Sequence, residues 1–424
     1  MDIRRIAGRR PVAVQDRGTR PGAGAVRRWS WPAVSASVAL LTGAAGCGAG
    51  EVTPPAPPAQ QQRSADRVNG LLGLAPSRQC QVTAKLIPSC GAWWGIAPEV
   101  FTETPPHLAL KSAERRMDRR ADIMHVYHRG KELFPTAAER ALTRDMRRPR
   151  MLLVNWKPSF EHTWAQIATG AVDRRIDRLA RHVKKTYPER FFLTVHHEPE
   201  DDVRTGADSG MTAEDYAAMY RHVVMRLREK GVTNVVTVMT YMGAPNWASK
   251  PWFETLYPGD DVVDWVALDP YADRRVTDFD SLINKTRPDF PNWPGFYRWM
   301  QWRFPGKPIM LAEWGVFERP DDRGYKERFY RSARARIPHY PQIKAVVYFD
   351  SPHAPRGDTR FDTTSGAGRA FTELAGDRYF RSTPVGRRVA GPDERQSEPG
   401  VAGTEPGVAG TGEPAAPRVG RGPR

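Results

Sequence analysis

The sequence predicts an α/β fold, a (β/α)8 TIM barrel, on three observations. Between about residues 79 and 382, short apolar runs alternate with amphipathic helical segments, as repeated β-α units require. The runs are almost continuously apolar, which favours parallel strands covered by helices over half-exposed antiparallel strands. The segment has roughly 300 residues, the size of a barrel with modest loops. The alternative, a doubly wound open sheet, would usually show a Gly-rich phosphate turn after an early strand, and we find none.

Eight strands are expected, each followed by a helix or a long loop. They are residues 92–97, 123–127, 151–156, 191–195, 235–240, 262–268, 309–312 and 345–349. Amphipathic spacing indicates helices over residues 173–186, 325–337 and 366–374. A further helix is expected to run to Lys230 with Thr212 as its N-cap.

The first 47 residues are typical of an export leader. Eight arginines precede a short apolar stretch that ends in Ala44-Ala45-Gly46-Cys47. A cysteine after small residues at this point resembles a bacterial lipoprotein signal, so Cys47 is a candidate for lipidation. The alternative is ordinary signal peptidase cleavage near Ala45. We expect an exported protein that is extracellular or held at the cell surface.

The segments on either side of the predicted domain have a different composition. Residues 48–78 include a run of Pro, Ala and Gln and are predicted to form an extended spacer. Residues 383–424 contain mainly Gly, Pro, Glu, Ala and Arg and are expected to be disordered. The formal net charge is +16, but the arginines are scattered rather than clustered with aromatics. We therefore predict no nucleic-acid partner, and membrane contact only through Cys47.

The chain has three cysteines, and two of them lie close together before the first expected strand. In an exported protein, Cys80 and Cys90 predict a disulfide that closes a small loop. Two free thiols are the alternative.

Two of the predicted strands lead directly into a glutamate. Residues 191–195 are followed by His196-His197-Glu198, and residues 309–312 by Glu313. A charge at the end of a buried strand is costly unless it faces a cleft or a partner. In a barrel such ends share one face, and two carboxylates there suit a retaining glycosidase. Two glutamates in surface loops are the alternative.

Aromatic and hydrogen-bonding side chains gather at the same strand ends. Sugars expose apolar ring faces and a rim of hydroxyls, so this mixture favours carbohydrate binding. The candidates for substrate binding or support are Trp94, Trp156, Tyr241, Asp269, Tyr271, Trp314 and Tyr348. For any single tryptophan, packing in the core is the alternative.

Four stretches resemble glycoside hydrolase family 26, in the clan of retaining (β/α)8 glycosidases. They are His197-Glu198, residues 257–271, residues 307–315 and residues 343–350. The resemblance covers roughly residues 90–380. It implies that Glu198 is the acid/base and Glu313 the nucleophile, that His197 lies near the reacting carboxylates, and that Tyr271 donates to Glu313.

The resemblance also implies a retaining glycoside hydrolase, most often an endo-β-1,4-mannanase, acting on β-linked polysaccharide by double displacement. Xylanase or mixed-linkage β-glucanase activity is the alternative within the family. This sequence departs from the mannanase pattern in two places. Pro199-Glu200-Asp201-Asp202 follows the His-Glu pair where a polar residue and a tryptophan are usual, and Tyr348 stands where a tryptophan is common. A carbohydrate-binding barrel without catalysis, or an inert barrel used as a spacer, is the alternative of another class; both glutamates argue against it. We expect a monomer without cofactor or metal.

Overall fold

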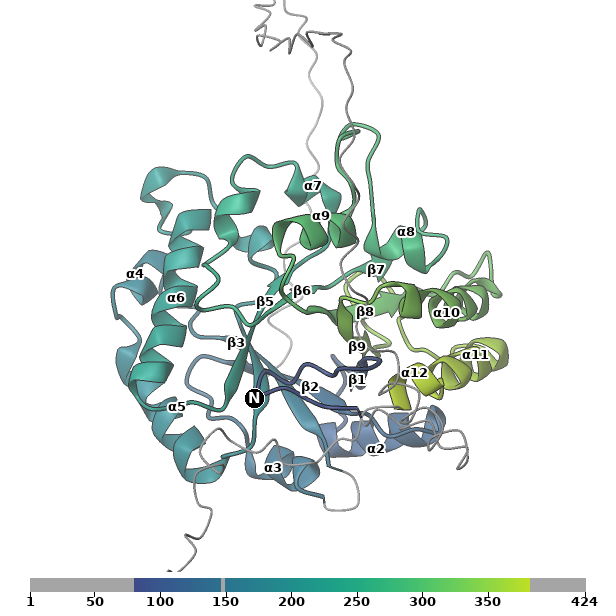
Figure 1. Cartoon of the computed structure of the whole chain (residues 1–424), viewed down its shortest axis with the longest axis horizontal. Coiled ribbons are helices and arrows are strands. Elements are labelled where there is room, and N and C mark those ends of the chain that lie inside the picture. The colour runs from purple at the N-terminus through teal and green to yellow at the C-terminus, as the bar shows by residue number, and fades with distance from the viewer. Residues whose placement is uncertain (1–79, 146–148, 382–424) are drawn as a thin grey trace, which may run out of the picture. The chain divides into compact units, whose positions relative to one another are not determined.

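The computed structural model describes residues 80–145 and 149–381 (Figure 1). The predicted leader with Cys47, the spacer up to residue 78 and the tail from residue 383 lie outside the described residues. Within the described ranges, no helix combines the length and the apolar character that crossing a membrane requires.

Eight parallel strands close into a barrel. They are β1 (Trp93–Ala97), β2 (Ile123–Arg129), β3 (Met151–Lys157), β4 (Phe191–Val195), β5 (Val235–Tyr241), β6 (Trp265–Leu268), β8 (Ile309–Val316) and β9 (Ile343–Phe349). Neighbours pair in chain order from β1 to β6, and the pairs β6–β8, β8–β9 and β9–β1 complete the ring. A short strand, β7 (Tyr271–Ala272), pairs with the last two residues of β8. The predicted TIM barrel is confirmed.

Helices surround the strands as an outer layer (Figure 1). They are α2 (Pro106–Arg116), α3 (Ala137–Thr143), α4 (Trp164–Ala168), α5 (Asp173–Thr186), α6 (Ala213–Glu229), α7 (Pro245–Ala248), α8 (Phe279–Ile283), α9 (Phe296–Arg303), α10 (Tyr325–Arg336), α11 (Ser365–Ala375) and α12 (Arg378–Arg381). The predicted cap of α6 is present, since the Thr212 side chain accepts from the Asp215 amide and Asp215 accepts from the Thr212 amide.

Side chains alternate between two buried layers along the strands. One layer fills the barrel interior and includes Trp93, Ile123, Leu153, Phe192, Trp265 and Met310. The other lies between the strands and the helices, and it contains five residues predicted for the substrate site: Trp94, Trp156, Tyr241, Trp314 and Tyr348. All five are fully buried. Their positions in the alternation turn them towards the helices, so their predicted part in substrate binding or support could only be support from behind the strands.

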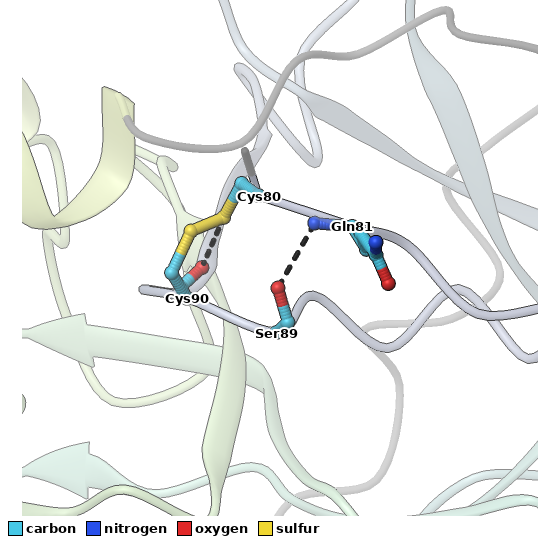
Figure 2. The surroundings of a disulfide bond; sticks show 4 residues. All are labelled: Cys80, Gln81, Ser89 and Cys90. Atoms are coloured by element: carbon cyan, nitrogen blue, oxygen red, sulfur yellow. Dashed lines mark hydrogen bonds between the residues drawn. A yellow bond between two sulfur atoms is a disulfide. The ribbon is translucent and has the colours of Figure 1, made fainter. Parts of the chain in front are cut away.

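The loop before β1 covers the end of the barrel where the strands begin. Cys80 and Cys90 are joined by a disulfide, as predicted (Figure 2). Within the loop, Leu86 joins the inner apolar layer, and its carbonyl accepts from the indole of Trp93 at 2.8 Å. The indole of Trp265 donates to the carbonyl of Lys85 at 2.7 Å. The loop therefore closes the barrel on the side opposite to the strand ends that carry the glutamates.

Candidate active site

An irregularity in β8 sets the direction of Glu313. In the pairing with β9, Leu311 lies opposite Val346 and Trp314 opposite Tyr348, so β8 carries one extra residue between these pairs. Such a bulge re-aims the side chains within it. Leu311 and Trp314 both face the helices, which leaves Glu313 free to point into the mouth of the barrel.

Glu313 is held by three hydrogen bonds. The hydroxyl of Tyr127, in β2, donates to Oε1 at 2.7 Å, and the hydroxyl of Tyr271, in β7, donates to Oε2 at 2.5 Å. The Glu313 amide donates to Oδ1 of Asp269 at 2.8 Å. With both oxygens accepting, the ionised form of the carboxyl group is favoured.

The close approach of Tyr271 depends on a glycine. Tyr271 pairs with Gly315 in the β7–β8 ladder. A Cβ atom at Gly315 would lie 2.9 Å from ring carbons of Tyr271, closer than such atoms can pack. The Gly after Glu313-Trp314 therefore makes room for the ring whose hydroxyl reaches Glu313.

Glu198 follows β4 in an unusual backbone conformation. Its φ and ψ are both 51°, in the left-handed region, and His196 has φ of 54°. Left-handed non-glycine residues are uncommon and concentrate at functional sites. The Glu198 amide donates to the carbonyl of Thr240 in β5 at 3.2 Å, which fixes the turn.

The two carboxyl groups have different environments. Burial, together with the charges of Glu313, Glu200 and Asp201, raises the pKa of Glu198 well above its usual range, and Arg356 opposes this only in part. Burial also raises the pKa of Glu313, but the hydroxyls of Tyr271 and Tyr127 counteract it. In the described structure Glu198 has no comparable pair of donors. A single proton shared by the two groups therefore resides on Glu198.

His197 lies beside the pair. Its Nε2 is 3.9 Å from Oε1 of Glu313, and its ring centroid is 6.0 Å from that of Tyr127. Burial, followed by the charges of His196 and Lys157, lowers the pKa of His197, so the imidazole is neutral near pH 7. It can orient a carboxylate or a sugar hydroxyl without adding charge.

A second group of contacts fixes the turn after Glu198. The indole of Trp164 donates to Nδ1 of His196 at 3.1 Å, so the proton of that imidazole is on Nε2. Nε2 in turn donates to Oδ2 of Asp202 at 2.8 Å, and Lys157 donates to the same oxygen at 2.6 Å. The hydrogen bond from His196 holds the pKa of Asp202 well below its usual range. Burial opposes this effect, and the hydrogen bond and charge of Lys157 add to it.

Tyr127 is a functional residue that the sequence prediction left without a role. It belongs to a cluster of aromatic rings with Tyr271, Phe317 and buried Phe349 at the strand ends. Ring centroids of Phe349 lie 6.5 Å from Tyr127 and 5.7 Å from Tyr271. The available signal was its place at the end of the predicted strand over residues 123–127, where a hydroxyl needs a partner.

Glu200 is a second acid with no role predicted from the sequence. It is 1% exposed, and its Oε1 accepts from the Met242 amide at 2.9 Å. Burial raises the pKa of Glu200 to about 8. Its side chain is therefore mostly protonated at neutral pH.

One group of described residues has metal-ligand spacing. His197, Asp269 and Glu313 each offer one atom, and these atoms lie within 4.8 Å of one another. Oδ1 of Asp269 and both oxygens of Glu313 already accept hydrogen bonds within the protein. A bound ion would compete with the contacts that hold Glu313.

The fold and this site define a class: a (β/α)8 barrel with two unequal carboxyl groups at strand ends, as in O-glycosyl hydrolases. Residues 164–288 match the family model described as glycosyl hydrolase family 26. The match includes Glu198, Asp269 and Tyr271. Over these residues the chain is therefore similar to glycosyl hydrolase family 26.

This chain is similar to part of each of two larger proteins. Endoglucanase H of Acetivibrio thermocellus is 26% identical over 296 residues, covering 68% of this chain and 30% of that protein. The β-1,3-xylanase TXYA of a Vibrio species is 27% identical over 148 residues, covering 35% of this chain and 28% of that protein. The chain thus spans less than a third of either relative.

Solved structures also show a likeness. A Bacillus subtilis mannanase has 12% identity and a TM-score of 0.46, covering 68% of this chain and 85% of that one. The similarity to the family rests on the sequence matches.

Proposed function

We propose that this protein is a retaining glycoside hydrolase that cleaves β-linked polysaccharide by double displacement. The observation that carries the proposal is the inequality of the two carboxyl groups: Glu313 accepts two tyrosine hydroxyls, while burial and negative neighbours keep Glu198 protonated. Pairs whose environments push their pKa values apart are suited to acid and nucleophile roles.

In the first step, the Glu313 carboxylate attacks the anomeric carbon and Glu198 gives its proton to the glycosidic oxygen. The bond to the leaving sugar breaks as the bond to Glu313 forms, leaving a covalent glycosyl-enzyme. Once its proton has left, Glu198 is ionised. It then takes a proton from water, which attacks the same carbon and releases Glu313.

For the substrate, we propose a β-glycan, with endo-β-1,4-mannanase-like activity as the first candidate. The family resemblance favours mannan, while the endoglucanase and xylanase among the relatives make β-glucan and xylan the second candidates. Of the two departures from the mannanase pattern, Tyr348 is fully buried in the helix–strand layer. That departure therefore does not shape the sugar surface.

The test combines an activity screen with chemical rescue. The purified domain is assayed on mannan, xylan, lichenan and curdlan. Glu198→Ala with azide and an activated substrate is expected to yield a β-glycosyl azide, and Glu313→Ala the α-azide, because azide replaces a different group in each. Wild-type activity in either variant would refute the assigned roles, and inactivity of the folded parent on every glycan would favour a non-catalytic barrel.

A further inference from the structure

Two exposed phenylalanines stand in loops at the strand-end face. Phe101 follows β1 and Phe160 follows β3, and each is 61% exposed. Of the large apolar side chains that are exposed in the described ranges, these are the two aromatic ones in loops after barrel strands. The third exposed aromatic, Trp302, lies in α9.

The loop of Phe101 is strained and clamped. Glu99 and Phe101 have φ of 48° and 63°, which side chains other than glycine seldom adopt. Between them, the amide of Val100 donates to the carbonyl of Asp350 at 3.1 Å, and its carbonyl accepts from Oγ of Ser351 at 2.6 Å. Strain of this kind persists only where the surroundings enforce it.

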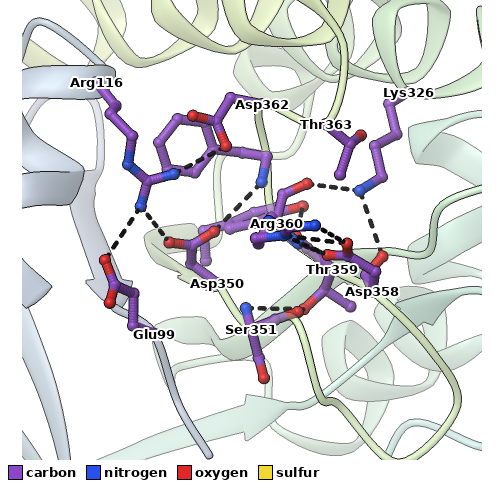
Figure 3. Close-up of polar contacts among 12 residues, drawn as sticks. Glu99, Arg116, Lys326, Asp350, Ser351, Asp358, Thr359, Arg360, Asp362 and Thr363 are labelled. Atoms are coloured by element: carbon purple, nitrogen blue, oxygen red, sulfur yellow. Dashed lines mark hydrogen bonds and ion pairs between the residues drawn. The ribbon is translucent and has the colours of Figure 1, made fainter. Parts of the chain in front are cut away.

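A charge network around buried Asp350 supports this clamp (Figure 3). Asp350 is fully buried and accepts from Arg116 at 2.9 Å. Arg116 also donates to Asp362 at 2.8 Å and lies 3.9 Å from Glu99. The network joins α2 to the loops after β1 and β9, so Phe101 is held at a defined place.

Aromatic contacts connect Phe101 with Glu313. Its ring centroid is 6.0 Å from that of Phe349, which contacts Tyr127 and Tyr271. Both tyrosines donate to Glu313. Phe101 is therefore the exposed end of a row of contacting rings that runs through buried Phe349 to the tyrosines at the nucleophile.

The loop of Phe160 is also fixed from below. Oγ of buried Ser159 accepts from the amides of Glu161 and His162, at 3.1 and 3.2 Å. The guanidinium of Arg175 donates to the carbonyl of Pro158. These hydrogen bonds hold the turn that carries Phe160, so its exposed ring has a defined position.

Phe160 is connected with the Glu198 side of the site. The ammonium of Lys157 lies 5.2 Å from its ring centroid and donates to Asp202 at 2.6 Å. Asp202 accepts from His196, which precedes the His197-Glu198 pair. The guanidinium of Arg129 also lies over this ring, 6.0 Å from its centroid, so both cations bring hydrogen-bond donors to the ring.

We propose that Phe101 and Phe160 are sugar-stacking platforms on opposite sides of the bond that is cleaved. Aromatic faces pack on the apolar faces of sugar rings. The nucleophile binds the anomeric carbon, so Phe101 serves the glycone side; the acid protonates the leaving oxygen, so Phe160 serves the leaving-group side. This inference rests on the proposed function and deepens it, because two platforms make the site an endo-acting cleft.

The test uses a hexasaccharide of the best polymer substrate, labelled at its reducing end. Without Phe101, fewer sugars are held on the glycone side, so Phe101→Ala is expected to give longer labelled products. Phe160→Ala is expected to give shorter ones. Each variant should lose about 10-fold in kcat/KM on the hexasaccharide, and Phe101→Trp and Phe160→Trp should retain the parent pattern.

Trp302→Ala is the matched control, because it removes an exposed aromatic near the end of α9, before β8 begins. An aryl disaccharide without leaving-group sugars should be cleaved by Phe160→Ala as by the parent. If the parent is active but the two alanine variants give the parent's products, or shift product length in the same direction, the platform proposal is wrong while the proposed function stands. A parent that cleaves no β-glycan would overturn the proposed function together with them.

Discussion

The hydroxyl of Tyr127 in β2 donates a 2.7 Å hydrogen bond to Oε1 of Glu313 in β8. Because Tyr271 donates to the other oxygen at 2.5 Å, the carboxylate is held from both sides. Its plane and its charge are thus set within the protein before any substrate binds. Such preorganised donors need little rearrangement during a reaction.

Removing either hydroxyl tests this arrangement. Tyr127→Phe and Tyr271→Phe are each expected to lower kcat about 10-fold to 100-fold, since a hydrogen bond to a charged group contributes roughly 1.5–3 kcal/mol. Each hydroxyl lowers the pKa of Glu313, so its loss raises that pKa and moves the acid limb of the pH–rate profile to higher pH. Tyr325→Phe is the control, because it removes a buried hydroxyl that donates to Val276. An unchanged acid limb would contradict the role.

Glu200 is expected to make stability depend on pH. Its folded pKa, about 8, is above the unfolded value, so its contribution is fully present below about pH 4. That contribution is lost as pH rises, by up to about 1.4 kcal/mol per unit until the folded pKa is passed. Glu200→Gln should therefore melt several degrees higher than the parent at pH 8.5 but not at pH 4. The control is Glu214→Gln, which changes an exposed carboxyl group. An equal shift in melting temperature at pH 4 and pH 8.5, or the same shift in the control, would contradict the role of Glu200.

Partly exposed Arg116 and fully buried Asp350 are expected to be strongly coupled. Arg116→Met leaves the fully buried Asp350 without its cation, which should cost about 2–4 kcal/mol of unfolding free energy. The double variant with Asp350→Asn should recover a large part of that loss. Burial already raises the pKa of Asp350 to about 6, so the single variant should lose more stability at pH 8 than at pH 5. Chemical denaturation at both pH values provides the measurement, and additive effects of the two substitutions would argue against coupling.

The disulfide is expected to contribute about 2–3 kcal/mol, given the short loop between Cys80 and Cys90. Thiol counting on denatured, unreduced protein that lacks Cys47 should find no free thiol. Thermal unfolding of the double Cys→Ser variant should occur at a lower temperature. Two titratable thiols would refute the bond.

We also propose that the enzyme is tethered to the cell surface through Cys47. The Arg-rich leader, the apolar stretch and the Pro/Ala/Gln spacer favour an exported lipoprotein, whose several acyl chains would give stable anchoring. Cys47→Ala should release the protein into the medium or leave the precursor uncleaved. A variant that fractionates with membranes as the parent does would rule out the anchor.

The fold could be predicted because eight apolar runs and the helices between them repeat the same pattern. Strand ends were less certain: β6 begins at Trp265 rather than residue 262, and β8 continues to Val316. The disulfide followed from the spacing of its two cysteines. These features depend on short stretches of sequence, which a single chain displays directly.

The site was only partly predictable. The two glutamates and the bond from Tyr271 came from strand ends and a family resemblance. The directions of the Trp94 and Trp314 side chains could not be predicted, because a one-residue offset in a strand decides whether a side chain faces the helices or the barrel mouth. Tyr127 was given no role because its partner, Glu313, is 186 residues away in the chain.

The extra residue in β8 has a consequence for how this site tolerates change. The position of Glu313 depends on the number of residues between Leu311 and Trp314 as much as on their identity. Deleting Ala312 would shift Glu313 by one residue relative to β9, while the irregularity between Ile309 and Met310 would remain. The carboxyl group should then lose its fit to the two tyrosine hydroxyls, although every reacting residue would still be present. Insertions and deletions in this strand should therefore be far more damaging to activity than conservative substitutions.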